Sequence, residues 1–158
     1  MNVACIGLLI TGTYMWLTRY VKKEPLVIEE ALFSTLTLPK AFLIGVVQGL
    51  ALFPGVSRSA LTIATALLFK SRRVEAVTFS FLLSIPSIIG AIGLKLYKTP
   101  QLELNHVPMI AGFLSAFVVG IPSLWILIKI VRQGNFFKFS YYCWAVGIAG
   151  LIAAYTLL

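Results

Sequence analysis

Apolar residues in this chain gather into long runs that short polar segments separate. Four runs are long enough, or nearly so, to cross the roughly 30 Å hydrocarbon core of a bilayer as helices. They cover residues 2–17, 75–96, 108–130 and 141–158. A fifth run, 41–69, is interrupted near its middle, and each half would be only roughly 20 Å long as a helix. The pattern predicts an all-α integral membrane protein, a single polytopic domain over 1–158 with about four spanning helices and one broken segment.

The broken segment, 41–69, has two interpretations: one long tilted helix, or a re-entrant helix-loop-helix that enters and leaves on the same side. Cytoplasmic loops carry an excess of Lys and Arg, so the basic residues can distinguish the two. A crossing segment would divide them six against six. A re-entrant hairpin divides them ten against two, with Arg58 left out as intramembrane. The ten are Arg19, Lys22, Lys23, Lys40, Lys70, Arg72, Arg73, Lys129, Arg132 and Lys138, and the two are Lys95 and Lys98. The charges favour a hairpin entered from the cytoplasm, with both termini outside.

Composition agrees with a membrane protein and narrows its chemistry. Hydrophobic residues make up 59% of the chain and charged residues 11%, which is outside the range of a soluble globular domain. The net charge of +8 does not indicate nucleic-acid binding, because the basic residues form short clusters between apolar runs and no continuous stripe. The five acidic residues are all glutamates at or beyond segment ends, so no carboxylate is expected inside the membrane and no metal-ligand set is visible.

The most informative charge is Arg58, which lies inside the broken apolar run. An arginine at the centre of a membrane segment costs about 2.5–3.5 kcal/mol on insertion scales, which makes it a functional candidate. Ser57 follows the Pro-Gly break at 54–55 and is placed to cap a helix, whose free N–H groups and dipole attract anions. The Arg58 guanidinium can bind two phosphate oxygens at once. Ser59 and Thr62 share the first turns, so the segment predicts a phosphate cradle. The alternative is that the serines only cap the helix while Arg58 pairs with a buried carbonyl.

Three further features could line the same cavity or serve packing. Gln48 lies two turns before the break and could reach the cradle or make a hydrogen bond between helices. Small residues at helical spacing let membrane helices approach closely, and we expect packing at two such stripes. The first comprises Ser80, Ser84 and Ser87, and the second Gly112, Ala116 and Gly120.

Two stretches of the chain resemble one known family. The run 48–63, QGLALFPGVSRSALTI, followed by FSFLLSIP at 79–86, is similar to the undecaprenyl-diphosphatases, a family also known for bacitracin resistance. The family signature P-G-x-S-R-S-x-x-T is matched at Pro54, Gly55, Ser57, Arg58, Ser59 and Thr62. The resemblance implies a multi-pass hydrolase of the bacterial inner membrane. It would convert undecaprenyl diphosphate to undecaprenyl phosphate and phosphate, which recycles the lipid carrier of peptidoglycan synthesis.

The resemblance also implies roles for individual residues. It makes Arg58, Ser57, Ser59 and Thr62 candidate catalytic residues, and Arg58, Ser57, Gly55 and Gln48 candidate substrate-binding residues. In the family, two inverted repeats each contribute a re-entrant hairpin, and this chain resembles the second repeat with its trailing helices. The glutamate-rich and Pro-x-Ser-Ser-Thr-Gly-His motifs of the first repeat do not occur here. We therefore expect the chain to need that N-terminal half for hydrolysis, while a divalent cation (Mg²⁺ or Ca²⁺) and a homodimer are left open.

A second function fits the same residues. A half-helix cradle that holds a phosphate could serve a membrane protein that binds or translocates polyprenyl phosphates without hydrolysing them. The sequence therefore carries two hypotheses, a lipid diphosphatase and a non-catalytic lipid-phosphate binder.

Overall fold

The described residues of the computed structural model, 2–21, 35–98 and 106–156, form helices and turns with no strand among them. The elements are α1 (Asn2–Leu17), the short 3-10 helix η1 (Thr18–Tyr20), α2 (Leu38–Leu50), α3 (Arg58–Leu68), α4 (Arg73–Lys98), α5 (His106–Arg132), the 3-10 helix η2 (Phe136–Lys138) and α6 (Phe139–Thr156). The predicted all-α membrane class is confirmed. Three helical stretches are long and apolar enough to cross a bilayer: Arg73–Lys98, Val107–Arg132 and Phe136–Thr156. The fourth predicted span, α1, is shorter, at 16 residues.

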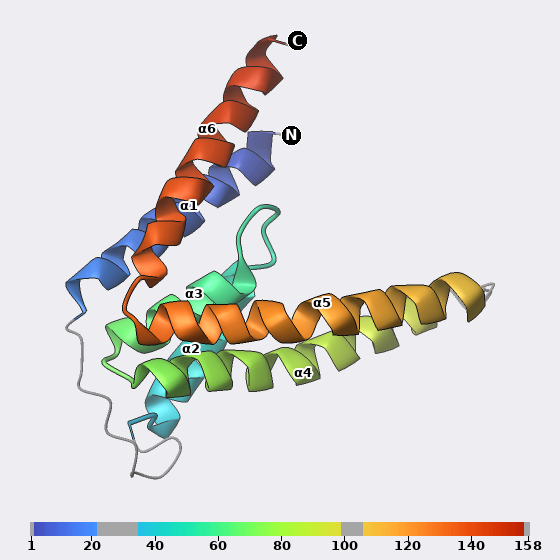
Figure 1. Cartoon of the computed structure of the whole chain (residues 1–158), viewed down its shortest axis with the longest axis horizontal. Helices are drawn as coiled ribbons and strands as arrows, with labels where there is room; N and C mark the ends of the chain where they lie inside the picture. Colours follow the sequence, from blue (N-terminus) through green and yellow to red (C-terminus); the bar gives the residue numbers. More distant parts are fainter. Residues whose placement is uncertain (1, 22–34, 99–105, 157–158) are drawn as a thin grey trace.

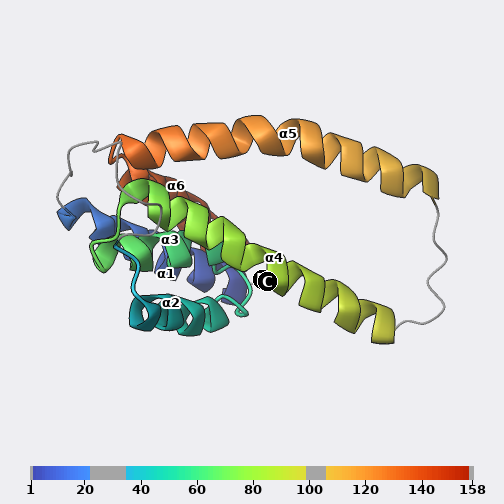
Figure 2. The same cartoon turned by 90° about the horizontal axis from the view of Figure 1, so that it is seen from below.

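The broken apolar segment folds back on itself. Helices α2 and α3 run side by side in opposite directions and are joined by residues 51–57, which we call the hairpin tip (Figures 1 and 2). The helix-loop-helix form of the broken segment is therefore confirmed, and a single long tilted helix is wrong. Its entry from the cytoplasm stays a prediction.

The helix ends explain the charge distribution. The C-terminal ends of α1, α3 and α5 and the N-terminal ends of α2, α4 and α6 gather on one side of the molecule (Figure 2). Basic residues at or beside these ends are Arg19, Lys40, Lys70, Arg72, Arg73, Lys129, Arg132 and Lys138. Lys95 and Lys98 lie in the last turn of α4, at its far end. Lys22 and Lys23 fall outside the described residues. The eight described basic residues therefore lie on one side, as the ten-against-two count predicts, and the cytoplasmic location of that side stays a prediction.

Helix α3 is the centre of the core. Its residues from 60 to 67 are all buried, because α1, α2 and α4 surround it. Ile63 and Leu67 pack with Ile44 of α2 and Val77 of α4. Burial on every face is typical of a helix in the middle of a bundle, and it holds the short α3 in place although it is too short to span.

Helices α3 and α5 end in the same kind of turn. The backbone takes positive φ values at Lys70 (58°) and Gly134 (74°). The following residue then bonds back to the helix, Ser71 N–H to the Ala66 carbonyl at 3.0 Å and Asn135 N–H to the Ile130 carbonyl at 3.1 Å. This pattern is a Schellman motif, which satisfies the last carbonyls of a helix and turns the chain sharply.

Helices α1 and α6 form a close antiparallel pair (Figure 1). Glycines allow this approach: a Cβ atom on Gly147 would lie 2.9 Å from the Leu9 side chain, and one on Gly12 would lie 2.7 Å from Trp144. The indole N–H of Trp144 donates a 3.4 Å hydrogen bond to Thr13.

Helices α4 and α5 extend away from the core as a pair of long arms (Figures 1 and 2). The stripe of Gly112, Ala116 and Gly120 lies on the exposed part of α5, and a Cβ atom on either glycine would meet nothing within 4 Å. The close packing predicted for this stripe is therefore not made with any described residue.

The α1–α6 contact predicts the effect of a larger side chain. Gly147→Leu would force the two helices apart, and we expect it to lower the free energy of unfolding by about 1–3 kcal/mol. Thermal unfolding in detergent, followed by helical circular dichroism, measures the change. Gly120→Leu is the matched control and should leave the midpoint unchanged or slightly raised. Equal destabilisation by both variants would contradict the packing described.

Candidate functional site

The hairpin tip is built from a series of tight turns. The N–H groups of Ala51, Leu52 and Phe53 bond back to carbonyls in the last turn of α2 at 3.0–3.4 Å. Val56 N–H then bonds to the Phe53 carbonyl at 3.2 Å, around Gly55 with φ +87°. Glycine adopts this left-handed conformation without the strain that a side chain would add. The tip thus reverses the chain and delivers it to the start of α3.

Helix α1 holds the tip by direct backbone contact. A Cβ atom on Gly55 would lie 1.9 Å from the Ala4 carbonyl oxygen, and one on Gly7 would lie 2.5 Å from the Pro54 carbonyl oxygen. The fully buried hydroxyl of Thr11 accepts a hydrogen bond from Ser57 N–H at 3.1 Å and donates one to the Gly7 carbonyl at 2.9 Å. These contacts fix the position of the residue that begins α3.

Ser57 caps α3 as the sequence predicts. Its hydroxyl oxygen accepts a hydrogen bond from Ala60 N–H at 3.4 Å, and its carbonyl accepts the first helical bond from Leu61 at 3.0 Å. The N–H groups of Arg58 and Ser59 have no acceptor among the described residues. They remain available at the positive end of the helix dipole.

Arg58 is half-buried, and its guanidinium makes no hydrogen bond or ion pair with any described residue. The alternative in which it pairs with a buried carbonyl is therefore not seen in the described part of the chain. Ser59 and Gly55 are exposed beside it. The structure thus brings four of the predicted site residues, Gly55, Ser57, Arg58 and Ser59, to one end of the hairpin.

Thr62 is placed differently from the other predicted site residues. Its side chain is 1% exposed, and its hydroxyl lies 2.5 Å from the hydroxyl of Ser80 on α4. The same hydroxyl lies 3.0 Å from the Arg58 carbonyl, to which it can donate. In this arrangement the Thr62 side chain joins α3 to α4, and its contact with a ligand stays a prediction.

Gln48 makes the other connection to α4. Its amide nitrogen donates a 2.9 Å hydrogen bond to the Ser87 hydroxyl, the contact between helices that was one of its two predicted roles. Its amide oxygen is buried without a partner among the described residues. Two serines of the predicted packing stripe therefore bond to the hairpin, Ser80 to α3 and Ser87 to α2. The third, Ser84, donates to the Phe81 carbonyl of its own helix.

The chemistry available at the tip is that of anion binding. Ser57 at the end of the tip and Arg58 and Ser59 at the start of α3 supply a guanidinium, serine hydroxyls and two N–H groups without an acceptor among the described residues. These donors suit phosphate oxygens. The described residues contain no group of three His, Cys, Asp or Glu side chains that could hold a metal ion. The buried carboxylate of Glu75 lies in the first turn of α4, at the basic side, where it accepts hydrogen bonds from Thr35. The tip and the start of α3 thus offer charge stabilisation without a neighbouring carboxylate among the described residues.

Comparison with known proteins decides the family. The family model described as "Bacitracin resistance protein BacA" matches residues 1–149. The chain belongs to this family. The match spans α1 to α5, the hairpin tip and the first part of α6, so it includes the predicted site.

Curated relatives with similar sequences carry one name. An undecaprenyl-diphosphatase of Korarchaeum cryptofilum is 40% identical over 94% of this chain and 53% of its own length. One of Desulforapulum autotrophicum is 41% identical over 94% of this chain and 52% of its own length. One of Methanothermobacter thermautotrophicus is 36% identical over 93% of this chain and 81% of its own length. The chain spans about half the length of the first two relatives. No solved structure matches it.

Sequence reasoning missed the residues of α1 that support the tip. Gly7 and Thr11 are four residues apart, and small residues at that interval indicate close helix packing. That spacing could have indicated that α1 approaches another element. It could not have indicated that the other element is the tip, because the two are more than forty residues apart in the chain.

The contact between the tip and α1 predicts a strong position dependence for glycine substitutions. Gly55→Ala adds a Cβ at positive φ against the Ala4 carbonyl, and we expect a loss of about 1–3 kcal/mol in the free energy of unfolding. Gly45→Ala lies in α2 with open space around it and should be neutral or stabilising by about 0.5–1 kcal/mol. Thermal unfolding of both variants in detergent tests this. Equal midpoints would show that the tip does not rest on α1.

The bond between Thr62 and Ser80 predicts an energetic coupling between α3 and α4. A double-mutant cycle of Thr62→Val and Ser80→Ala should give about 0.6–1.7 kcal/mol of coupling, the range found for hydrogen bonds inside membranes. Thr62→Val with Ser115→Ala is the control cycle, because Ser115 is exposed and bonds within α5. The control should be additive within about 0.5 kcal/mol. Coupling of the same size in both cycles would refute a direct bond.

Proposed function

We propose that the hairpin tip binds the diphosphate group of undecaprenyl diphosphate and that this chain contributes this site to an undecaprenyl-diphosphatase. The observation that carries the proposal is the half-buried Arg58 guanidinium, which has no partner among the described residues and lies beside two free N–H groups. A buried or half-buried charge needs a counter-charge, and a lipid diphosphate brings one to this depth. The names of the curated relatives support the same substrate.

In this proposal each residue at the end of the tip and the start of α3 has a separate task. Arg58 binds two oxygens of the diphosphate and stabilises the charge that develops as the phosphoanhydride bond breaks. Ser59 and the free N–H groups complete the oxyanion contacts. Ser57 keeps the start of α3 in place, and Thr62 positions Arg58 through its bonds to the Arg58 carbonyl and to Ser80.

Hydrolysis of a phosphoanhydride also needs a nucleophile or an activated water and a proton donor for the leaving group. The tip has no carboxylate or histidine beside Arg58 within the described residues. We propose that these groups come from the N-terminal half that the family resemblance implies, in keeping with the chain spanning about half the length of the first relatives. The tip donors do not fit a divalent cation by themselves, since Mg²⁺ and Ca²⁺ prefer oxygen ligands from carboxylates and carbonyls. We therefore assign no step to a cation.

We further propose that the protein is a multi-pass protein of the bacterial inner membrane, with the basic side of the molecule in the cytoplasm. The helix ends that carry eight of the ten predicted cytoplasmic basic residues support this orientation. The tip, at the opposite end of the hairpin, would then open toward the extracytoplasmic side.

Substitution of Arg58 tests the proposal. Arg58→Lys keeps the charge but removes the two-pronged contact, and we expect roughly tenfold to a hundredfold weaker binding of undecaprenyl diphosphate. Binding is measured on the full 158-residue chain in lipid nanodiscs. Arg132→Lys is the matched control, because Arg132 is exposed at the basic end of α5, and it should bind like wild type. Equal binding by both variants would mean that Arg58 is structural.

Phosphate release from the same preparation separates the two candidate functions. The absence of acid-base groups beside Arg58 in the described part favours binding without turnover by this chain alone. Addition of a co-expressed N-terminal half with the glutamate and Ser-Ser-Thr-Gly-His motifs should then produce Arg58-dependent turnover. Turnover by the chain alone would overturn the need for that half. Tight binding that no such partner converts to turnover would favour the non-catalytic lipid-phosphate binder.

A further inference from the structure

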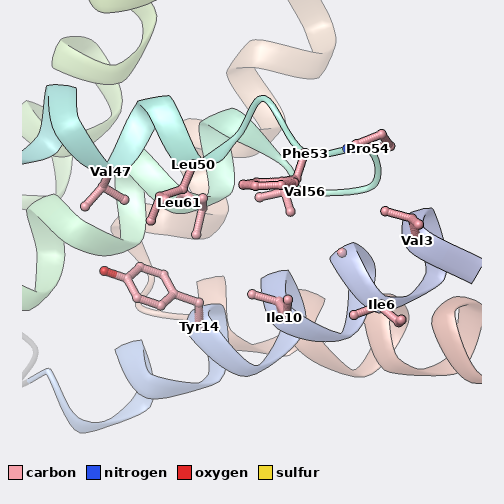
Figure 3. Close-up of a pocket in the computed structure, with 11 residues that line it drawn as sticks. Val3, Ile6, Ile10, Tyr14, Val47, Leu50, Phe53, Pro54, Val56 and Leu61 are labelled. Carbon is pink, nitrogen blue, oxygen red and sulfur yellow. The ribbon is translucent and has the colours of Figure 1, made fainter.

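A cavity with a volume of about 390 Å^3 lies between α1 and the hairpin (Figure 3). One wall is formed by residues of α1, among them Ile6 and Ile10, and the other by Val47 of α2 and by Phe53 and Val56 of the tip. Figure 3 shows these side chains pointing toward one another from the two walls. This volume is within the range of small-molecule pockets, roughly 300–1,000 Å^3.

The cavity offers its occupant almost only hydrocarbon. Tyr14 is the one lining residue in Figure 3 that carries a side-chain oxygen, and its hydroxyl is already bonded to Thr65 at 3.0 Å. The large apolar residues on both walls are half exposed, for example Ile10 at 53% and Phe53 at 63%. An apolar chain would bury these surfaces, whereas a polar ligand would lose its hydrogen bonds there.

The cavity and the phosphate cradle share the hairpin tip. Pro54 and Val56 line the cavity, and the next residues along the chain are Ser57 and Arg58. A molecule with an anionic head on Arg58 and a hydrocarbon tail would therefore find an apolar cavity where the tail leaves the head. The backbone contacts of Gly55 and Gly7 join the two walls beside the residues that precede Ser57 and Arg58.

We propose that this cavity binds the first isoprene units of the lipid whose diphosphate lies on Arg58. The inference rests on the proposed function and adds to it a site that recognises the tail. It makes the tail contribute to affinity independently of the head.

Farnesyl diphosphate and inorganic pyrophosphate are the probes that separate tail from head. We expect the 158-residue chain in nanodiscs to bind farnesyl diphosphate at least tenfold more tightly than pyrophosphate, because only the former buries isoprene units. Val47→Trp fills the cavity and should remove most of that difference while pyrophosphate binding stays unchanged. Val46→Trp is the matched control, since Val46 is exposed on α2 and does not line the cavity, and it should keep the difference. Ile10→Trp fills the cavity from α1 and should reproduce the Val47→Trp result. Agreement between the two variants would exclude misfolding of α2 as the cause of the loss.

The outcomes distinguish this inference from the function on which it rests. Equal farnesyl diphosphate binding by Val47→Trp and Val46→Trp, with Arg58→Lys weakening both probes, would overturn the cavity and leave the cradle. Displacement of the farnesyl advantage by added phosphatidylglycerol would show that ordinary acyl chains fill the cavity, and would also overturn the inference. Unchanged binding of both probes by Arg58→Lys, or no binding by wild type, would overturn the cradle and the cavity together.

Discussion

The backbone contact between α1 and the hairpin tip is the constraint on which the rest of the site depends. A re-entrant hairpin places irregular backbone at membrane depth, where water cannot satisfy its polar groups, so it is tolerated only when protein or a water-filled cavity surrounds it. Here Gly55 lies against the Ala4 carbonyl, Gly7 lies against Pro54, and Thr11 bonds to Ser57. Neither glycine position has room for a Cβ atom, so the tip and α1 are in direct backbone contact. The position of Arg58 is thereby set one residue after a fixed point.

Hydrogen bonds from α4 also hold the hairpin in position, through polar side chains and not through apolar packing. Ser80 and Ser87 are seven residues apart and bond to Thr62 of α3 and Gln48 of α2 respectively. A hydroxyl inside a membrane has few alternative partners, so such bonds specify register even when each is worth only about 0.6 kcal/mol. Helix α4 therefore sets the position of both α2 and α3 along its own axis. The result is a tip held by several bonds beside the Arg58 charge, which has no partner among the described residues. The proposed anion stabilisation would use this preorganisation.

The cavity lies beside the cradle, so the head and the tail of the proposed ligand would each meet a different kind of surface. The tip presents donors and a positive charge, while the space between α1 and α2 presents hydrocarbon. The tip belongs to both surfaces: with the start of α3 it carries the donors, and with α1, α2 and Leu61 of α3 it lines the cavity. A lipid diphosphate has the same division, with the charge at one end and the apolar chain attached directly to it. The long arms of α4 and α5 take no part in either surface and remain exposed along most of their length.

The sequence by itself determined the helical class, the broken segment, the helix-loop-helix hairpin and which residues gather at its end, while their role as a phosphate cradle is a proposal. Apolar runs and basic clusters report directly on membrane depth and sidedness, and the cradle is contiguous in the chain, so a linear pattern contains it. Ser57 could be identified as a cap for the same reason, because capping is local. Only the tertiary structure decided that Thr62 joins α4 and that Gly7 and Thr11 support the tip. It also decided that Gly112, Ala116 and Gly120 meet no described residue. These outcomes depend on which helices lie side by side, and contacts between segments far apart in the chain leave no periodic signal in either one.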